Sequence, residues 1–241
     1  MSNPTAVITG ASRGIGRACA RALAFGGWQL VLSGRNQNAL AALAAALPGE
    51  GHVALAADLL TSSGRDVLLR EIEKRVPEAT VQCLGGRVPT TVPCDQWEST
   101  MAVNFHAVVA VDELIIPHLL ARGSGTIVHL SSSAAVHGRA QPAYACAKAA
   151  LNRYIVTRGR ECLPRGVSIS GLMPAAVEGD DNDWARARTA DPERYARMCQ
   201  GQSLGRPQTT DEVAAVVAFL CSPTGRLFGG CVLPADSALD T

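Results

Sequence analysis

The stretch VITGASRGIGRA, residues 7–18, decides how the chain begins to fold. A short apolar run is followed by three glycines and then by an alanine-rich segment. Gly10, Gly14 and Gly16 permit a tight turn and let the backbone approach a diphosphate at the N-terminus of a helix. The spacing is GxxxGxG, which differs from the usual GxGxxG dinucleotide pattern. The stretch predicts a strand, a phosphate-binding turn and a helix, and a plain strand-to-helix connection is the competing interpretation.

The same alternation of short apolar runs and longer amphipathic segments continues along the chain, and it is typical of buried parallel strands between helices. It predicts an α/β fold: one Rossmann-like domain over residues 1–241, with a doubly wound parallel sheet of about seven strands and helices on both faces. The predicted strands are residues 6–8, 29–32, 53–56, 81–84, 126–130, 167–172 and 231–233, and the predicted helices are residues 14–25, 38–47, 62–76, 96–121, 143–162 and 210–221.

One segment breaks this rhythm. Residues 175–205 are polar and rich in Arg and Asp, and they follow a predicted strand. An insertion at the carboxyl end of a strand in an open α/β sheet lies over the ligand crevice. The segment is therefore predicted to be a substrate lid. The sequence TTDE that follows, at residues 209–212, fits a capping box at the start of the last helix.

Composition excludes several classes of function. The net charge is +1 with both signs intermixed, so neither a nucleic acid nor an anionic membrane is predicted as a partner. The longest apolar runs are far shorter than a membrane span and the first residues do not resemble a signal peptide, so we expect a cytoplasmic protein. Eight scattered cysteines show no zinc-site spacing, which predicts reduced, mostly buried thiols and no metal.

Cofactor choice is predicted from the ends of the second and third strands. Asp58, in LAADL, can accept a hydrogen bond from an adenine amino group, or can simply be a turn residue. The second strand ends in Ser33-Gly34-Arg35, without the acidic residue that binds the ribose 2′-hydroxyl of NAD. Arg35 and Arg13 would pair with a 2′-phosphate, which favours NADP(H) over two merely solvated arginines.

Tyr144 and Lys148 lie one helical turn apart in the segment AYACAKAAL. A nearby ammonium stabilises a phenolate and lowers the pKa of a phenol, which makes the tyrosine a general acid or base for a hydroxyl/carbonyl pair. Upstream, the strand IVHLSSS ends in three serines whose hydroxyls can bind a substrate carbonyl. The Tyr/Lys spacing alone is common, and it becomes specific together with the glycine turn and the serines.

With these motifs the sequence resembles the short-chain dehydrogenase/reductase superfamily, in its small single-domain form, over essentially the whole chain. The resemblance rests on TGASRGIG (residues 9–16), Asp58, VNF (103–105), LSSS (130–133), YACAK (144–148) and the MP at 173–174. The tail, with GRPQTTDEVAAVVAFLCS and FGGCVLPAD, is similar to that of 3-oxoacyl-[acyl-carrier-protein] reductases.

The resemblance implies a role for each matching residue. Tyr144 exchanges a proton with the substrate oxygen, Lys148 holds the nicotinamide ribose and depresses the tyrosine pKa, and Asn104 anchors a proton-relay water. The serine that polarises the carbonyl is Ser132 when aligned from the strand and Ser131 when counted back from Tyr144; we favour Ser132. The implied NADP(H)-binding residues are Gly10, Ser12, Arg13, Gly14, Ile15, Gly16, Arg35, Asp58, Leu59, Gly85, Tyr144, Lys148, Pro174 and Val177.

Three departures from the family pattern stand out. Cys83-Leu84-Gly85-Gly86 replaces the usual Asn-Asn-Ala-Gly, so two side-chain amides that bond within the central sheet are absent. Pro174-Ala175 replaces Pro-Gly, and a threonine expected soon after it is missing. Residues 236–238 read Asp-Ser-Ala where Asp-Gly-Gly is frequent.

The predicted function is an NADP(H)-dependent oxidoreductase that reduces a ketone to a secondary alcohol, or the reverse, in specialised or acyl/polyketide-type metabolism. A β-ketoacyl thioester, a polyketide or other specialised metabolite, a sugar and a steroid-like ketone are all open as substrates. The candidate pocket residues are His137, Gln141, Trp184 and the segment 175–202. The alternatives are a catalytically weak NADP(H)-binding sensor or scaffold, and a non-redox dehydratase or epimerase. Ala- and Val-rich faces of the helices at 96–121 and 143–162 predict a homotetramer with 222 symmetry or a dimer.

Overall fold

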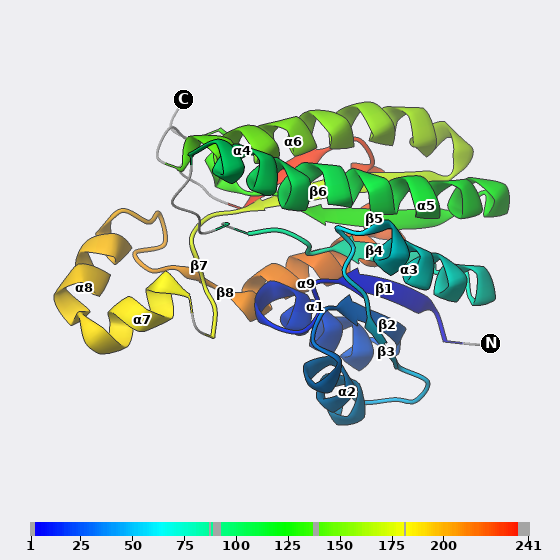
Figure 1. The fold of residues 1–241 in the computed structure, drawn as a ribbon, viewed down its shortest axis with the longest axis horizontal. Helices are drawn as coiled ribbons and strands as arrows, with labels where there is room; N and C mark the ends of the chain where they lie inside the picture. Colours follow the sequence, from blue (N-terminus) through cyan, green and yellow to red (C-terminus); the bar gives the residue numbers. More distant parts are fainter. Residues whose placement is uncertain (1–2, 87, 89–92, 137–139, 181, 236–241) are drawn as a thin grey trace.

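A seven-stranded parallel sheet forms the centre of the computed structural model, which describes residues 3–86, 88, 93–136, 140–180 and 182–235 (Figure 1). The strand order is β3-β2-β1-β4-β5-β6-β9. The order reverses between β1 and β4, which is the topological switch point where such sheets bind ligands. The predicted α/β fold is confirmed. The strands are β1 Thr5–Thr9, β2 Gln29–Gly34, β3 Val53–Ala56, β4 Ala79–Gln82, β5 Gly125–Leu130, β6 Val167–Pro174 and β9 Val232–Ala235.

Helices cover both faces of the sheet (Figure 1). On one face, α1, α2 and α9 bury Leu23, Leu40 and Val217 against the strands. On the other face, α3 and α5 bury Leu68 and Ile115 in a second core. Each strand is thus buried on both sides, which explains its nearly continuous apolar sequence. The bounds are α1 Gly14–Phe25, α2 Gln37–Ala46, α3 Ser62–Lys74, α5 Ala107–Arg122, α6 Pro142–Cys162 and α9 Thr210–Cys221, with short 3₁₀ turns at Ser133–Ala135, Leu163–Arg165 and Thr224–Phe228.

The helix predicted at 96–121 is interrupted. It consists of α4 Pro93–Met101, a π-helical turn at Ala102–His106, and α5. The stretch Cys94–Arg122 has a mean hydropathy of 1.4 and is long enough to cross a membrane, contrary to the prediction that every apolar segment is too short. Val111, Ile115 and Leu119 of this stretch are buried against the sheet, so packing in the core explains its apolar composition.

Two further predictions need correction. β4 ends at Gln82 rather than Leu84, because the amides of Cys83 and Leu84 donate to the Thr9 hydroxyl at 3.1 and 3.3 Å instead of extending the ladder. The eight cysteines are free, as predicted, but most are not buried: only Cys19, Cys162 and Cys221 are.

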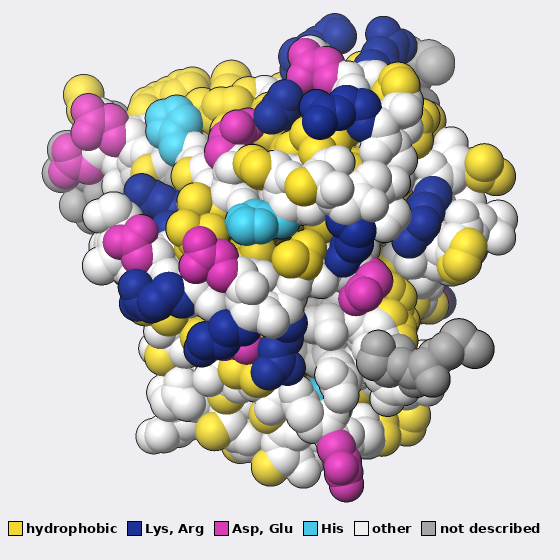
Figure 2. Space-filling view, turned by 90° about the vertical axis from the view of Figure 1, so that its right-hand side faces the viewer, with side chains coloured by type: hydrophobic (Ala, Val, Ile, Leu, Met, Phe, Trp, Pro, Cys, Tyr) yellow, Lys and Arg dark blue, Asp and Glu magenta, His cyan; other side chains and the backbone are white. Residues whose placement is uncertain are grey.

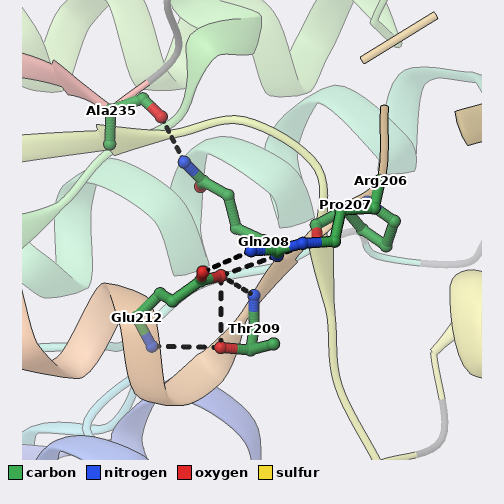
Figure 3. A network of polar contacts seen from close by, with 6 residues as sticks. All are labelled: Arg206, Pro207, Gln208, Thr209, Glu212 and Ala235. Atoms are coloured by element: carbon green, nitrogen blue, oxygen red, sulfur yellow. Dashed lines mark hydrogen bonds and ion pairs between the residues drawn. The ribbon is translucent and has the colours of Figure 1, made fainter. Parts of the chain in front are cut away.

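The segment predicted as a lid forms a separate pair of helices beyond the carboxyl ends of the strands, at the left of Figure 1. It contains β7 Val177–Glu178, α7 Asp183–Ala190 and α8 Pro192–Gln200, and β7 pairs with β8 Gln208–Thr209 on the return. The predicted capping box at Thr209 and Glu212 is confirmed. Glu212 also pairs with Arg206 at 2.6 Å, so the return segment is held at the start of α9 (Figure 3).

The face opposite the lid mixes basic and acidic side chains (Figure 2). Mixed charge of this kind creates no strong field of one sign at that face.

Candidate active site

The glycine turn follows β1 at the switch point of the sheet. A Cβ on Gly16 would collide with the carbonyl oxygen of Gly10, so only glycine lets α1 begin this close to the strand. Gly14 has a φ of +55° and nothing within 4 Å of the position that its Cβ would take. The first turn of α1 therefore faces open space, as a helix N-terminus that binds a phosphate requires.

A polar cavity of about 600 Å³ opens beside this turn. Arg35 makes no hydrogen bond or ion pair with any residue that the structure describes. Two guanidinium groups in one exposed cavity suit the doubly charged 2′-phosphate of NADP(H). The cavity is lined by Ser12, Arg13, Arg35, Asn36, Gln37 and Asn38, which brings together three of the predicted cofactor residues.

Asp58 and Leu59 follow β3 at the same edge of the sheet. Asp58 Oδ1 accepts a hydrogen bond from the amide of Leu60 at 3.1 Å, so part of the carboxylate serves a local turn, as the competing interpretation of this residue expected. Oδ2 stays available to an adenine amino group. The Leu59 side chain is buried in the core under α3, so it can offer a ligand only its backbone.

Tyr144 and Lys148 lie on α6, where the Nζ atom of Lys148 is 5.9 Å from the centre of the tyrosine ring. The lysine is 3% exposed and donates to the carbonyl oxygen of Leu130 at 2.7 Å. Burial lowers the pKa of Lys148 to about 8, because desolvation disfavours the ammonium. The Lys148 side chain is therefore held beside the Tyr144 phenol in surroundings that favour the loss of its proton.

Asn104 comes from the π-helical turn and is completely buried. Its Oδ1 accepts from the amide of Gly86 at 2.9 Å, and its Nδ2 donates to the carbonyl oxygens of Gly86 and Thr100. A Cβ on Gly85 would lie 2.8 Å from Asn104 Oδ1 and 3.3 Å from Lys148 Nζ. The turn after β4 thus joins Asn104 to Lys148, and glycine leaves the space between them clear.

The two candidate serines have different partners. Ser131 is buried, and its hydroxyl donates to Oδ1 of Asn152 on α6 in a short hydrogen bond. Ser132 is partly exposed, and its Oγ accepts a 3.2 Å hydrogen bond from the amide of Ala134 while its proton stays available. The donor needed by a substrate carbonyl is therefore free on Ser132 and engaged on Ser131, which supports the prediction of Ser132.

The lid is attached to the body at both of its ends. At the first end, Pro174 closes β6 and Val177 begins β7 and packs against the core, so both predicted residues lie where the lid leaves the sheet. Asp180 of the lid pairs with Arg17 in the first turn of α1. At the return, Gln208 accepts from the amide of Ala175. It also donates to the carbonyl of Ala235 (Figure 3).

A second cavity, of about 310 Å³, lies at the return of the lid. Its lining is Ala175, Gln202, Ser203, Leu204, Arg206, Gln208, Pro234 and Ala235. Gln141 precedes α6, and the Trp184 ring contacts Tyr195 within the lid at a centroid distance of 6.1 Å. His137 lies outside the described residues. No cluster of His, Cys, Asp or Glu that could hold a metal occurs among the residues with described positions.

Sequence reasoning missed a set of buried polar residues beneath this site: Thr9, Gln82, Asp112 and His129, none of which is more than 1% exposed. The signal was present, because each interrupts an apolar run: ITG, VQC, VDE and VHL. A single polar residue does not change the prediction of a buried strand or helix, so it does not stand out in the sequence. The residues align as a set only when the strands are in register.

The sheet, the glycine turn and the Tyr/Lys pair define an α/β oxidoreductase that interconverts an alcohol and a ketone. The family model for the short chain dehydrogenases matches residues 4–189, and the chain belongs to that family.

Relatives match almost the full chain. Meso-2,3-butanediol dehydrogenase of Serratia marcescens is 30% identical, over 97% of this chain and 93% of its own. Gluconate 5-dehydrogenase of Gluconobacter oxydans is 26% identical, over 99% and 95%. Among solved structures, L-sorbose reductase of Gluconobacter frateurii in complex with NADPH and L-sorbose superposes with a TM-score of 0.90 at 26% identity, covering 100% of this chain and 98% of that protein.

Proposed function

We propose that the protein is an NADP(H)-dependent reductase that converts a small ketone to a secondary alcohol. The observation that carries the proposal is the buried Lys148 ammonium, held by the Leu130 carbonyl beside the Tyr144 ring at the switch point of the sheet. Burial of a cation costs desolvation free energy, so a buried ammonium calls for an explanation. Lysines whose pKa is shifted by their surroundings cluster at functional sites.

The preference for NADP(H) is supported by the cavity that contains Arg13 and Arg35. An acidic residue at Ser33 or Gly34 would repel a 2′-phosphate, and neither position is acidic. The related L-sorbose reductase was solved with NADPH. Ser12 lines the same cavity. We assign the remaining predicted contacts to Gly10, Ile15, Gly85, Pro174 and Val177.

The cofactor, when bound, supplies the hydride. Ser132 is assigned to hold the substrate carbonyl oxygen through its free proton. Tyr144 is assigned to deliver the proton that this oxygen gains, and Lys148 to keep the tyrosine acidic and to bind the nicotinamide ribose. Asn104 is assigned to fix the turn at Gly86 and to hold a relay water beside Lys148.

The substrate class that we propose is a small hydroxyketone or polyol, rather than an acyl-carrier-protein thioester. The proposal rests on the relatives, because the cavity at the return of the lid combines polar residues with Ala175, Leu204, Pro234 and Ala235 and does not by itself select a substrate class. Three relatives are named for a diol, a sugar acid and a ketose. The similarity of the tail to 3-oxoacyl-carrier-protein reductases stays a prediction.

A substrate panel tests the proposal. Purified protein is mixed with NADPH and, separately, with acetoin, L-sorbose, 5-ketogluconate, a β-ketoacyl thioester and a steroid ketone, and NADPH absorbance is followed. We expect turnover of at least one small hydroxyketone. Ser132→Ala should lower kcat far more than Ser131→Ala does. Tight NADPH binding without turnover of any carbonyl would overturn the enzyme assignment.

The alternative of a sensor or scaffold rests on the missing asparagines at Cys83 and Leu84 and on the missing threonine after Pro174. The backbone amides of Cys83 and Leu84 are bonded to Thr9, so the turn keeps its anchor to the sheet without those side chains. The substrate panel decides between this alternative and an enzyme. We also propose a single domain, a cytoplasmic location and a homotetramer or dimer formed through α4, α5 and α6. Light scattering at micromolar concentration tests the oligomer, and a monomer would contradict it.

A further inference from the structure

A row of polar side chains crosses the sheet directly beneath the candidate active site. Thr9 of β1 is in register with Gln82 of β4, and Gln82 is in register with His129 of β5. They lie on the sheet face that carries Val7 and Ile127, under α5. Asp112 of α5 meets this row from above and is 0% exposed.

Hydrogen bonds connect the row in a fixed direction. The Thr9 hydroxyl donates to Gln82 Oε1 at 3.0 Å, and Gln82 Nε2 donates to Asp112 Oδ1 at 2.9 Å. Asp112 Oδ2 lies 3.0 Å from His129 Nε2, at ion-pair distance though without good hydrogen-bond geometry. Each group has one workable orientation, because the threonine has a single proton to give and the carboxylate can only accept.

The row is connected to the catalytic groups at both ends. Thr9 Oγ1 accepts from the amides of Cys83 and Leu84, which begin the turn that binds Asn104. At the other end, His129 precedes Leu130, whose carbonyl holds Lys148. Tyr154 of α6 packs edge-on against His129 and Phe105, and burial together with the Asp112 carboxylate raises its pKa well above the usual range.

An unpaired carboxylate in this position would be strongly destabilising. An apolar sheet face does not need Gln82, Asp112 and His129 for packing, since Val, Leu or Ile would fill the same volume at lower risk. The residues do provide hydrogen bonds that lead to the turn after β4, where Cys83 and Leu84 replace the two asparagines of the family pattern.

We infer that Gln82, Asp112 and His129 form a positioning network that orients the Thr9 hydroxyl and thereby sets the turn at residues 83–86, and with it Asn104 and Lys148. The inference rests on the proposed ketone reduction, because its purpose is to hold the two catalytic groups. The three residues touch neither substrate nor cofactor, so they are positioning residues.

An exchange of amide and carboxylate tests the network. Gln82→Glu places two carboxylates face to face, so kcat should fall by about tenfold or more, and Asp112→Asn should lower kcat several-fold. In the double variant, the carboxylate at position 82 accepts one hydrogen bond from the Thr9 hydroxyl and one from the side-chain amide at position 112. The oxygen of that amide faces His129. Each link again pairs a donor with an acceptor, although the bond between positions 82 and 112 is reversed, and kcat should return to within about threefold of the wild type.

Two readouts separate positioning from general stability. In Asp112→Asn, hydrogen exchange at the amides of Cys83, Leu84 and Gly86 should accelerate about tenfold relative to the amides of β4, and the double variant should restore it. Thr80→Val is the matched control: this hydroxyl is buried on the same strand and face, and it has no hydrogen-bond partner among the described residues. It should change neither exchange at the turn nor kcat.

The outcomes are distinct. If Gln82→Glu fails to fold, a double variant that is more active than Asp112→Asn alone still supports the network. If the loss of kcat in the double variant equalled the product of the losses in the two single variants, the network would be overturned. Unchanged hydrogen exchange at the turn in Asp112→Asn would also overturn it. Should the wild type reduce no ketone, the proposed function fails, while amide exchange and NADPH affinity still decide whether the network sets the turn.

Discussion

The two ends of the cofactor crevice are built in opposite ways. At the catalytic end, Lys148 and Asn104 are almost completely buried and each is bonded to backbone carbonyls or amides of another element. At the phosphate end, Arg13 and Arg35 are exposed on two loops, β1–α1 and β2–α2, around an open cavity. The difference follows from what each end must do.

Proton transfer requires atoms placed within hydrogen-bond reach, and small displacements are costly, so the catalytic end is bonded on every side. Recognition of a phosphate depends on charge, which acts over several ångströms and tolerates mobile side chains. Substitutions at the catalytic end should therefore abolish the reaction, whereas those at the phosphate end should shift affinities by modest factors.

The largest expected effect is that of Tyr144→Phe. The ring keeps its volume and its place beside Lys148, but the proton donor is lost. We expect kcat to fall by about 10² to 10⁴, the usual contribution of a positioned acid, with little change in NADPH affinity. Single-turnover absorbance measures the rate and fluorescence titration measures the affinity. A folded, NADPH-binding variant that still reduces ketones at the wild-type rate would remove Tyr144 from the mechanism.

The second effect concerns the burial of Lys148. Burial lowers its pKa from 10.5 to about 8, so the folded apo-protein loses this proton at lower pH than the unfolded chain does. Between these values the unfolded chain binds more protons, and the free energy of unfolding should rise with pH by up to about 3 kcal/mol from this group. Urea unfolding at pH 7 and pH 10 measures it.

Lys148→Met is the control for this pH dependence, because it lacks the titrating group. The wild type should gain stability relative to this variant between about pH 8 and pH 10.5. If the free energy of unfolding changed with pH in the same way in both proteins, burial of the Lys148 ammonium would not be destabilising the fold.

The phosphate end should respond more weakly. We expect NADPH to bind at least about tenfold more tightly than NADH, a difference of about 1.4 kcal/mol, and Arg35→Asp to narrow or reverse this preference. Because the site is exposed, added salt should also reduce the preference. Fluorescence titration with both cofactors measures the dissociation constants, and equal values in the wild type would contradict the assignment of NADP(H).

The smallest expected effect is a loss of stability from a substitution in the loop that carries Arg35, between β2 and α2. Asn36 caps α2, its Oδ1 accepting from the amide of Ala39 at 3.0 Å. Asn36→Ala should lower the free energy of unfolding by about 1 kcal/mol, whereas Asn36→Asp should retain the cap. Urea denaturation compares the two. A loss of several kcal/mol would mean that this loop is coupled to the core as tightly as the catalytic end is.

Predictability from sequence also differed between the two ends. The glycine turn, Arg35 and the Tyr/Lys pair each depend on residues close in the chain, so these short motifs, taken together, predicted their use. The π-helical turn at Asn104 was not foreseen, because an apolar run looks the same whether the helix is regular or not. The identity of the serine stayed open, since counting from the strand and from Tyr144 gave different residues.

The sequence by itself determined the α/β fold and the motifs from which the phosphate-binding turn and the catalytic residues are proposed, because hydrophobic periodicity and short motifs are local properties of the chain. Tertiary structure alone decided that Asn152 occupies the Ser131 hydroxyl, that Thr9 accepts from the backbone amides of Cys83 and Leu84, and that Gln82 and His129 both meet Asp112. These contacts join residues from 17 to 75 positions apart, and their partners are set by strand register and helix packing, which no local pattern records.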